Sequence, residues 1–296
     1  MNLVAALPPD PREKVRLAVY AEKAGAVRAV AATIAALIRQ RREEGRSAVL
    51  GLATGATPIP LYAELVRRHR EEGLSFADVV TFNLDEYLGL AANDPQSYHR
   101  FMRRHLFDHI DIPAGSVHLL DGTAVGPDIE RVCGDYEASI RQAGGIDLQL
   151  LGIGRSGHIG FNEPGSSPAA RTRLVRLHPV TRRLAAAEFG RLDRTPACAL
   201  TMGTGTILEA RRVIVLAWGQ PKAAMVRAAV EGPETSRVPA SFVQRHPDAL
   251  VVLDRDAASQ LSRFEGEERA TPPAAGRHRK VRADSGRLWS CGTGDI

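Results

Sequence analysis

Short apolar runs that alternate with helical segments are the feature of this sequence that most limits its fold. The run at 47–53 is almost continuously apolar, as is typical of a strand buried on both faces of a parallel sheet. Similar runs predict strands at 15–20, 47–53, 79–83, 116–120, 148–151, 173–177, 197–201, 212–217 and 249–254. Helical patterns lie between them, at 21–42, 58–69, 95–110, 128–143, 181–189, 223–231 and 256–261. This alternation predicts a doubly wound, Rossmann-like α/β fold, with a mostly parallel sheet and helices on both faces.

The length and composition fit one large α/β domain or two small ones. The 296 residues are 44% hydrophobic, which is enough for a sizeable core. Apolar residues become rare from Ser262 onward, while proline, glycine and charged residues increase. We therefore expect a single α/β domain over 1–261 and a disordered tail over 262–296.

Cysteine usage and the apolar segments indicate a soluble cytoplasmic protein. Cys133, Cys198 and Cys291 are odd in number and far apart, so they predict neither a disulfide framework nor a zinc site. The N-terminus has no basic region before its short apolar run, which argues against a signal peptide. The segment 24–38 is interrupted by Arg28 and is too short to cross a bilayer, so we expect no membrane partner.

The net charge of +5 is modest, and the dense basic cluster at 277–282 falls in the predicted tail. A nucleic-acid-binding protein more often carries its basic residues on a folded face. We therefore expect no nucleic-acid partner. His105 and His109 are four residues apart on one predicted helix, but no glutamate or cysteine completes a metal set there and no HExxH motif is present. We interpret them as ordinary histidines.

A polar, glycine-rich stretch at 147–165 directly follows a predicted buried strand. It contains His158, Asn162 and Glu163 in close succession. Histidine can titrate near neutral pH, and a turn can bring Glu163 to His158. For His158 alone, a hydrogen-bonded structural role is the alternative. For the whole stretch, we expect an active-site loop that performs acid–base chemistry on a small ligand.

The same stretch formally matches the GxGxxG pattern at 152–157. A dinucleotide site would need a helix directly after the glycines and an acidic residue about twenty positions on. The Asn-Glu-Pro-Gly segment at 162–165 prevents a long helix, and the residues that follow are basic. We therefore expect no nucleotide cofactor.

Two further strand ends carry candidate ligand-binding groups. Thr57 is a plausible N-cap and Pro58 suits a first helical position, so the turn at 54–57 has the strand–turn–helix form of an anion site. A simple tight turn is the alternative. Asp85 and Glu86 follow another strand at the edge where open α/β sheets place ligands. Ordinary acids at the start of a solvated loop are the alternative there.

Four strings together resemble the glucosamine-6-phosphate deaminase/isomerase family. They are GLATGATP at 51–58, VTFNLDEY at 80–87, LGIGRSGHIGFNEPG at 151–165 and ALTMGTGT at 199–206. The similarity runs in the same order from about 15 to 261. The sister family, 6-phosphogluconolactonase, shares the fold and a Gly-His loop but typically continues differently after the histidine.

The resemblance implies conversion of glucosamine 6-phosphate and water to fructose 6-phosphate and ammonia, without a cofactor. Asp85 matches the base that moves a proton between C2 and C1 of the opened sugar. His158 matches the group that assists ring opening, with Glu163 as its carboxylate partner and Ser156 beside them. The phosphate-binding residues of the family match Thr54, Gly55, Ala56, Thr57 and Lys222. The implied partner is a small phosphorylated amino sugar, and a homo-oligomer is compatible with the sequence.

Three positions depart from the family pattern. Ser156 stands where many members have aspartate, so we expect slower ring opening or a larger share carried by Glu163. Glu188 stands where the family has a phosphate-binding arginine, and Arg183 or Arg191 are candidates to replace that cation. Losing it would cost about 1.5–3 kcal/mol per charged hydrogen bond. Val175 replaces a lysine of regulated members, so activation by an N-acetylated sugar phosphate is expected to be weaker.

These departures leave alternatives to the implied reaction. The substrate could be a different amino-sugar phosphate, the activity could be lactone hydrolysis, or the protein could be a sugar-phosphate sensor without catalysis. A sensor would keep the phosphate ligands and lose the acid–base set. The pattern is the reverse, because Asp85, His158 and Glu163 remain while a phosphate ligand is missing. This favours an enzyme.

Overall fold

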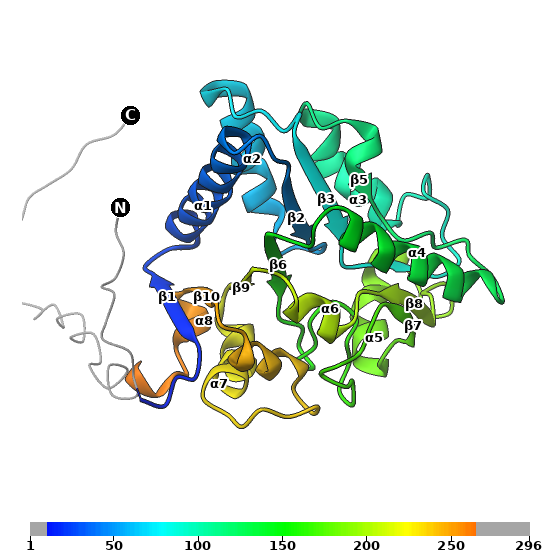
Figure 1. The fold of residues 1–296 in the computed structure, drawn as a ribbon. Coiled ribbons are helices and arrows are strands. Elements are labelled where there is room, and N and C mark those ends of the chain that lie inside the picture. Colours follow the sequence, from blue (N-terminus) through cyan, green and yellow to red (C-terminus); the bar gives the residue numbers. More distant parts are fainter. Residues whose placement is uncertain (1–10, 265–296) are drawn as a thin grey trace, which may run out of the picture. The chain divides into compact units, whose positions relative to one another are not determined.

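The computed structural model describes residues 11–264, and its main element is a seven-stranded parallel sheet (Figure 1). The strand order is β1-β10-β9-β6-β2-β3-β5. The bounds are β1 (Arg16–Tyr20), β2 (Ala48–Leu52), β3 (Val79–Asn83), β5 (Val117–His118), β6 (Leu148–Gly152), β9 (Arg212–Ala217) and β10 (Ala249–Asp254). Every pairing in this sheet is parallel, which confirms the predicted fold class.

Helices cover both faces of the sheet, as the sequence predicted. One face packs against α1 (Lys23–Glu43), α2 (Ile59–Glu72) and α3 (Tyr98–His105). The other packs against α4 (Asp128–Gln142), α6 (Thr204–Leu208), α7 (Ala223–Val230) and α8 (Arg255–Ala258). Within β2, Leu50 and Leu52 belong to the first layer and Val49 to the second, as the alternation of a strand requires.

A second, smaller sheet was not predicted as a separate unit. It has the order β4-β8-β7, all antiparallel, with bounds β4 (Asp85–Tyr87), β8 (Cys198–Thr201) and β7 (Arg173–Arg176). The runs at 173–177 and 197–201 are therefore strands, as expected, but they leave the main sheet. Helix α5 (Pro179–Phe189) connects β7 to β8.

The boundaries of α2 and α3 differ from the predictions, and α6 was not predicted. Thr57 is not an N-cap, because α2 begins at Ile59 with Pro58 in the capping position and no side-chain cap. The predicted helix at 95–110 is shorter, since α3 is capped by Ser97 and a 3-10 turn follows at Phe107–His109. Other 3-10 turns lie at Ala114–Ser116, Gln220–Lys222, Pro239–Arg245 and Ser262–Phe264.

Residues 262–264, which follow the predicted domain end at 261, form a 3-10 turn that packs on the described chain. Phe264 is buried, and Arg263 forms an ion pair with Glu13 near the other end of the described chain. The rest of the predicted tail, including the basic cluster at 277–282, lies outside the described residues. Among residues 11–264, no helix is long and apolar enough to span a membrane.

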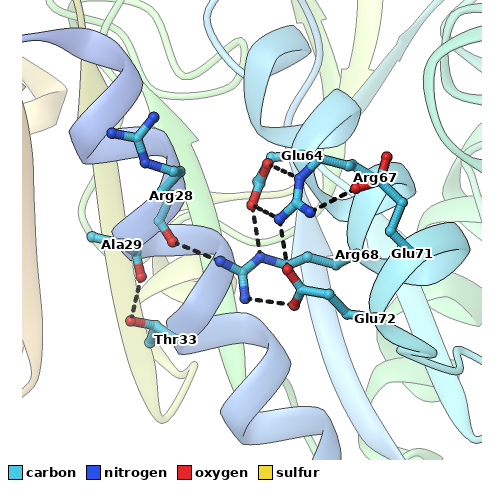
Figure 2. A network of polar contacts seen from close by, with 8 residues as sticks. All are labelled: Arg28, Ala29, Thr33, Glu64, Arg67, Arg68, Glu71 and Glu72. Carbon is cyan, nitrogen blue, oxygen red and sulfur yellow. Dashed lines mark hydrogen bonds and ion pairs between the residues drawn. The ribbon is translucent and has the colours of Figure 1, made fainter. Parts of the chain in front are cut away.

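An ion-pair network lies on the outer side of α2 (Figure 2). Glu64 accepts hydrogen bonds from Arg67 at 2.8 Å and from Arg68 at 2.9 Å. Arg67 also pairs with Glu72, and Arg68 reaches the carbonyl oxygen of Arg28 on α1 at 3.5 Å. Such partly exposed pairs each contribute at most about 1 kcal/mol, so the network helps to orient α2 on α1 rather than to drive folding.

Gly134→Ala should stabilise the protein by about 0.5–1 kcal/mol, because glycine is costly inside a helix. Gly134 lies exposed within α4, and a methyl group there would have no atom within 4 Å. Urea unfolding curves of the two proteins measure the difference. A destabilised variant would contradict the expectation.

Candidate active site

Four neighbouring strands of the main sheet deliver seven of the nine predicted site residues to one cavity, whereas Ser156 and Glu163 do not line it. Adjacent strands β9, β6, β2 and β3 are followed at their carboxyl ends by Lys222, His158, the 54–57 turn and Asp85. Because these strands are parallel, their carboxyl ends share one edge of the sheet. The cavity at that edge has a volume of about 940 Å³, and its lining includes Thr54, Gly55, Ala56, Thr57, Asp85, His158 and Lys222.

Asp85 is the most strongly perturbed acid of this cavity. It is only 5% exposed, and no described residue donates a hydrogen bond to its carboxylate. Burial, and secondarily the neighbouring Glu86, raise its pKa to about 8. A carboxylate with these properties is a strong base for its type, as proton abstraction from carbon requires.

Glu86 has a different task from its neighbour. Adjacent residues of β4 point to opposite sides, so Glu86 turns away from the cavity that Asp85 lines. Its carboxylate accepts backbone N–H groups of Tyr98 and His99, both at 3.0 Å, at the start of α3. Glu86 therefore anchors α3 to the small sheet.

His158, Glu163 and Ser156 form one hydrogen-bonded cluster. His158 Nδ1 lies 3.1 Å from Glu163 Oε2, and Ser156 Oγ lies 2.8 Å from the same nitrogen. Ser156 also donates to Glu163 Oε2 at 3.0 Å. Burial opposes ionisation of Glu163, but the hydrogen bonds from His158 and its other neighbours outweigh burial and lower its pKa. An ionised Glu163 holds the Nδ1 proton, which leaves Nε2 to exchange protons with a ligand.

Asn162 and Arg173 form hydrogen bonds that stabilise the loop carrying His158 and Glu163. Asn162 donates to the carbonyl oxygen of Met202 at 2.8 Å, and Arg173 donates to Asn162 Oδ1 at 2.9 Å. Arg173 also reaches Ser166 Oγ at 3.2 Å. Arg173 therefore contacts residues on both sides of Glu163.

The cavity is also lined by a lysine that has no acidic partner among the described residues. Lys222 Nζ donates to the carbonyl oxygen of Ile153 at 2.7 Å, and no carboxylate within residues 11–264 pairs with it. Burial, and secondarily the nearby Arg155, lower its pKa. Trp218 Nε1 donates to the carbonyl oxygen of Thr57 at 2.9 Å, which fixes the 54–57 turn beside Lys222.

The arginines expected to replace the missing cation do not line the cavity. Arg183 is exposed on α5, and Arg191 pairs with Asp193 at 2.7 Å. Glu188 does line the cavity, and partial burial raises the pKa of its carboxyl. The arginines among the lining residues are instead Arg100, Arg104 and Arg155, which the sequence interpretation did not select.

Aromatic side chains that were not selected from the sequence complete one wall. Tyr87 and Tyr98 line the cavity, and their hydroxyl oxygens are 3.3 Å apart. His105 also lines it and packs on Phe101, with ring centroids 4.5 Å apart. Among the described residues, no group of three or more His, Cys, Asp or Glu side chains is placed to hold a metal ion.

The sequence of the chain matches one protein family. The family model "Glucosamine-6-phosphate isomerases/6-phosphogluconolactonase" matches residues 21–252. The chain belongs to this family. It is 52% identical to a glucosamine-6-phosphate deaminase of Hahella chejuensis over 73% of this chain and 81% of that one. It is 50% identical to one of Arthrobacter sp. over 77% of this chain and 85% of that one.

Solved structures show the same relationship. A monomeric glucosamine-6-phosphate deaminase is 42% identical, with a TM-score of 0.79 over 82% of this chain and 99% of that one. A 6-phosphogluconolactonase of Thermotoga maritima is 24% identical, with a TM-score of 0.63 over 81% of this chain and 98% of that one. The second likeness extends to the fold alone, whereas the first is accompanied by high sequence identity.

Proposed function

We propose that the protein is an enzyme of carbohydrate metabolism that converts glucosamine 6-phosphate and water to fructose 6-phosphate and ammonia. The observation that carries this proposal is a buried carboxylate, Asp85, that has no ion-pair partner among the described residues and shares a cavity with His158 and Lys222. The names of relatives at 50% and 52% identity support it. The proposed steps use only proton transfers and water.

Ring opening is the step proposed for His158. Its Nε2 takes a proton from the C1 hydroxyl group and returns one to the ring oxygen, so the C1–O bond of the ring breaks and an aldehyde forms. Glu163 stabilises the imidazolium of this step through the 3.1 Å contact with Nδ1. Ser156 adds a hydrogen bond at 2.8 Å but no charge, so Glu163 carries the electrostatic part.

Isomerisation and deamination are the steps proposed for Asp85. Its carboxylate removes the proton from C2 and returns it to C1, while a proton from the amino group reaches the C1 carbonyl oxygen. The product is an imine at C2. Water adds to this carbon, the C–N bond breaks and ammonia leaves. The sugar then carries a ketone at C2. The 54–57 turn and Lys222 hold the phosphate during these steps, since backbone N–H groups and a cation stabilise an anion.

The test is product analysis with the full-length protein. Glucosamine 6-phosphate should yield ammonia and fructose 6-phosphate in equal amounts. Hydrolysis of 6-phosphogluconolactone without ammonia release would favour the sister activity. Binding of glucosamine 6-phosphate without turnover would favour a sensor, and turnover of only another amino-sugar phosphate would change the substrate.

Glu188→Gln should lower the KM for glucosamine 6-phosphate by up to about five-fold, since a partly exposed charge interaction is worth at most about 1 kcal/mol. The change removes a negative charge from the cavity that receives the phosphate. Steady-state kinetics measure it, with unphosphorylated glucosamine as the control substrate whose KM should not fall. A higher KM for the phosphate ester would show that Glu188 binds the substrate favourably.

The location and assembly are also proposals. A cytoplasmic location is supported by Cys133 and Cys198, which are both unpaired among the described residues. A homo-oligomer remains compatible with the sequence, although one relative of known structure is described as monomeric.

A further inference from the structure

A second cation accompanies Lys222 in the cavity. Lys222 Nζ donates a hydrogen bond to the carbonyl oxygen of Ile153, which lies two residues before Arg155. The side chains of Lys222 and Arg155 both line the cavity. Within residues 11–264, neither has a carboxylate partner. Two neighbouring cations without a counter-charge repel each other, which also contributes, after burial, to the lowered pKa of Lys222. An anionic ligand between them would relieve this repulsion.

The loop that carries Arg155 also adjoins the 54–57 turn. A methyl group placed on Gly152 would be 3.9 Å from the Thr57 side chain. Trp218, which precedes Lys222, donates to the carbonyl oxygen of Thr57. The ends of β2, β6 and β9 therefore converge on one spot, and each contributes a group that can bind an anion.

We propose that Arg155 and Lys222 together bind the phosphate group of the substrate, and that Arg155 determines the preference for phosphorylated sugars. The proposal rests on the proposed function and adds a binding residue to it. A phosphate monoester carries a charge of about −1.5 to −2 near neutral pH, which one lysine neutralises only in part. The guanidinium group supplies the rest and can donate to two phosphate oxygens at once.

Arg100 and Arg104 line the same cavity but are less well placed for this role. They belong to α3, which follows β3 and is anchored to β4 through Glu86. In the sheet, β3 lies three strand spacings from β9, or about 14 Å, whereas β6 lies one spacing away, about 5 Å. The loop after β6 is thus the nearer source of a second cation for Lys222.

The test compares binding of inorganic phosphate and of glucosamine 6-phosphate in the wild type and in five variants: Arg155→Met, Arg155→Lys, Arg183→Met, Arg100→Met and Arg104→Met. Calorimetry should show phosphate bound about 10- to 100-fold more weakly by Arg155→Met, the effect of losing a charged hydrogen bond. KM for glucosamine 6-phosphate should rise by a similar factor with little change in kcat. Arg155→Lys should lose less affinity, because it keeps the charge.

Arg183→Met is the matched control, since Arg183 is exposed and does not line the cavity. Unchanged phosphate affinity in Arg155→Met would overturn the proposal, as would an equal loss in Arg183→Met. A loss confined to Arg100→Met or Arg104→Met would place the second cation on α3 and overturn it too. The wild type could release no ammonia while Arg155→Met still binds phosphate more weakly. That result would contradict the proposed reaction but support the anion-binding role of Arg155.

Discussion

Asp85→Asn should release ammonia from glucosamine 6-phosphate at least about 100-fold more slowly than the wild type, the usual scale of a lost general base. Asparagine keeps the shape of the side chain but cannot accept a proton at neutral pH. Because Asp85 has no hydrogen-bond donor among the described residues, the substitution breaks no internal contact. Steady-state kcat from ammonia release measures the effect.

Asp135→Asn is the control for this prediction, because it removes an exposed carboxylate on α4, outside the cavity. Its rate should equal that of the wild type. Equal rates in the wild type and Asp85→Asn would remove Asp85 as the base. A folding defect is separated from a chemical one by comparing unfolding transitions of the three proteins.

The pKa of about 8 for Asp85 also sets the direction of two pH effects. The base acts only when ionised, so kcat/KM should rise with pH and level off above about 8. The pKa of Asp85 in the folded protein lies above the ordinary value of 3.8. The contribution of this group to the free energy of unfolding is therefore largest below pH 3.8, and it is lost as the pH rises through the folded pKa. Asp85→Asn should therefore be more stable than the wild type at high pH, with the advantage shrinking in acid.

The main sheet could be predicted from sequence because its strands are buried on both faces and read as nearly continuous apolar runs. The small sheet could not. Its strand β4 spans Asp85–Tyr87, which lacks an apolar run, and its register pairs Asp85 with Thr201. That pairing depends on tertiary contacts between residues far apart in sequence.

The local parts of the site were predictable for a similar reason. His158 and Glu163 are close enough in sequence for one turn to join them, and the structure has them 3.1 Å apart. The proximity of Lys222 to the loop of Arg155 is different, because it arises from the adjacency of β6 and β9 in the sheet. The sequence placed both Asp85 and Glu86 at the ligand-binding edge of the sheet, whereas strand alternation sends their side chains to opposite sides.

Gly154→Ala should reduce ammonia release by about 100-fold, the scale expected when a catalytic group is displaced by about 1 Å. A methyl group on Gly154 would lie 2.0 Å from His158 Nε2, so the imidazole could not keep its position. The backbone cannot easily yield, because Gly154 donates to the carbonyl oxygen of His158 at 2.9 Å and accepts from Gly157 at 3.0 Å. Kinetic assays at saturating substrate measure the loss.

Gly134→Ala separates this displacement from the general effect of adding a methyl group, because a methyl at Gly134 has open space around it. That variant should keep wild-type kcat. Binding of inorganic phosphate adds a second readout, since Lys222 is held by Ile153 and the 54–57 turn by Trp218. Gly154→Ala should have a lower kcat than the wild type, but its dissociation constant for phosphate should stay within about three-fold of the wild-type value. This combination is expected when the change is confined to the imidazole. Wild-type kcat in Gly154→Ala would show that the position of His158 over this glycine is not needed for the reaction.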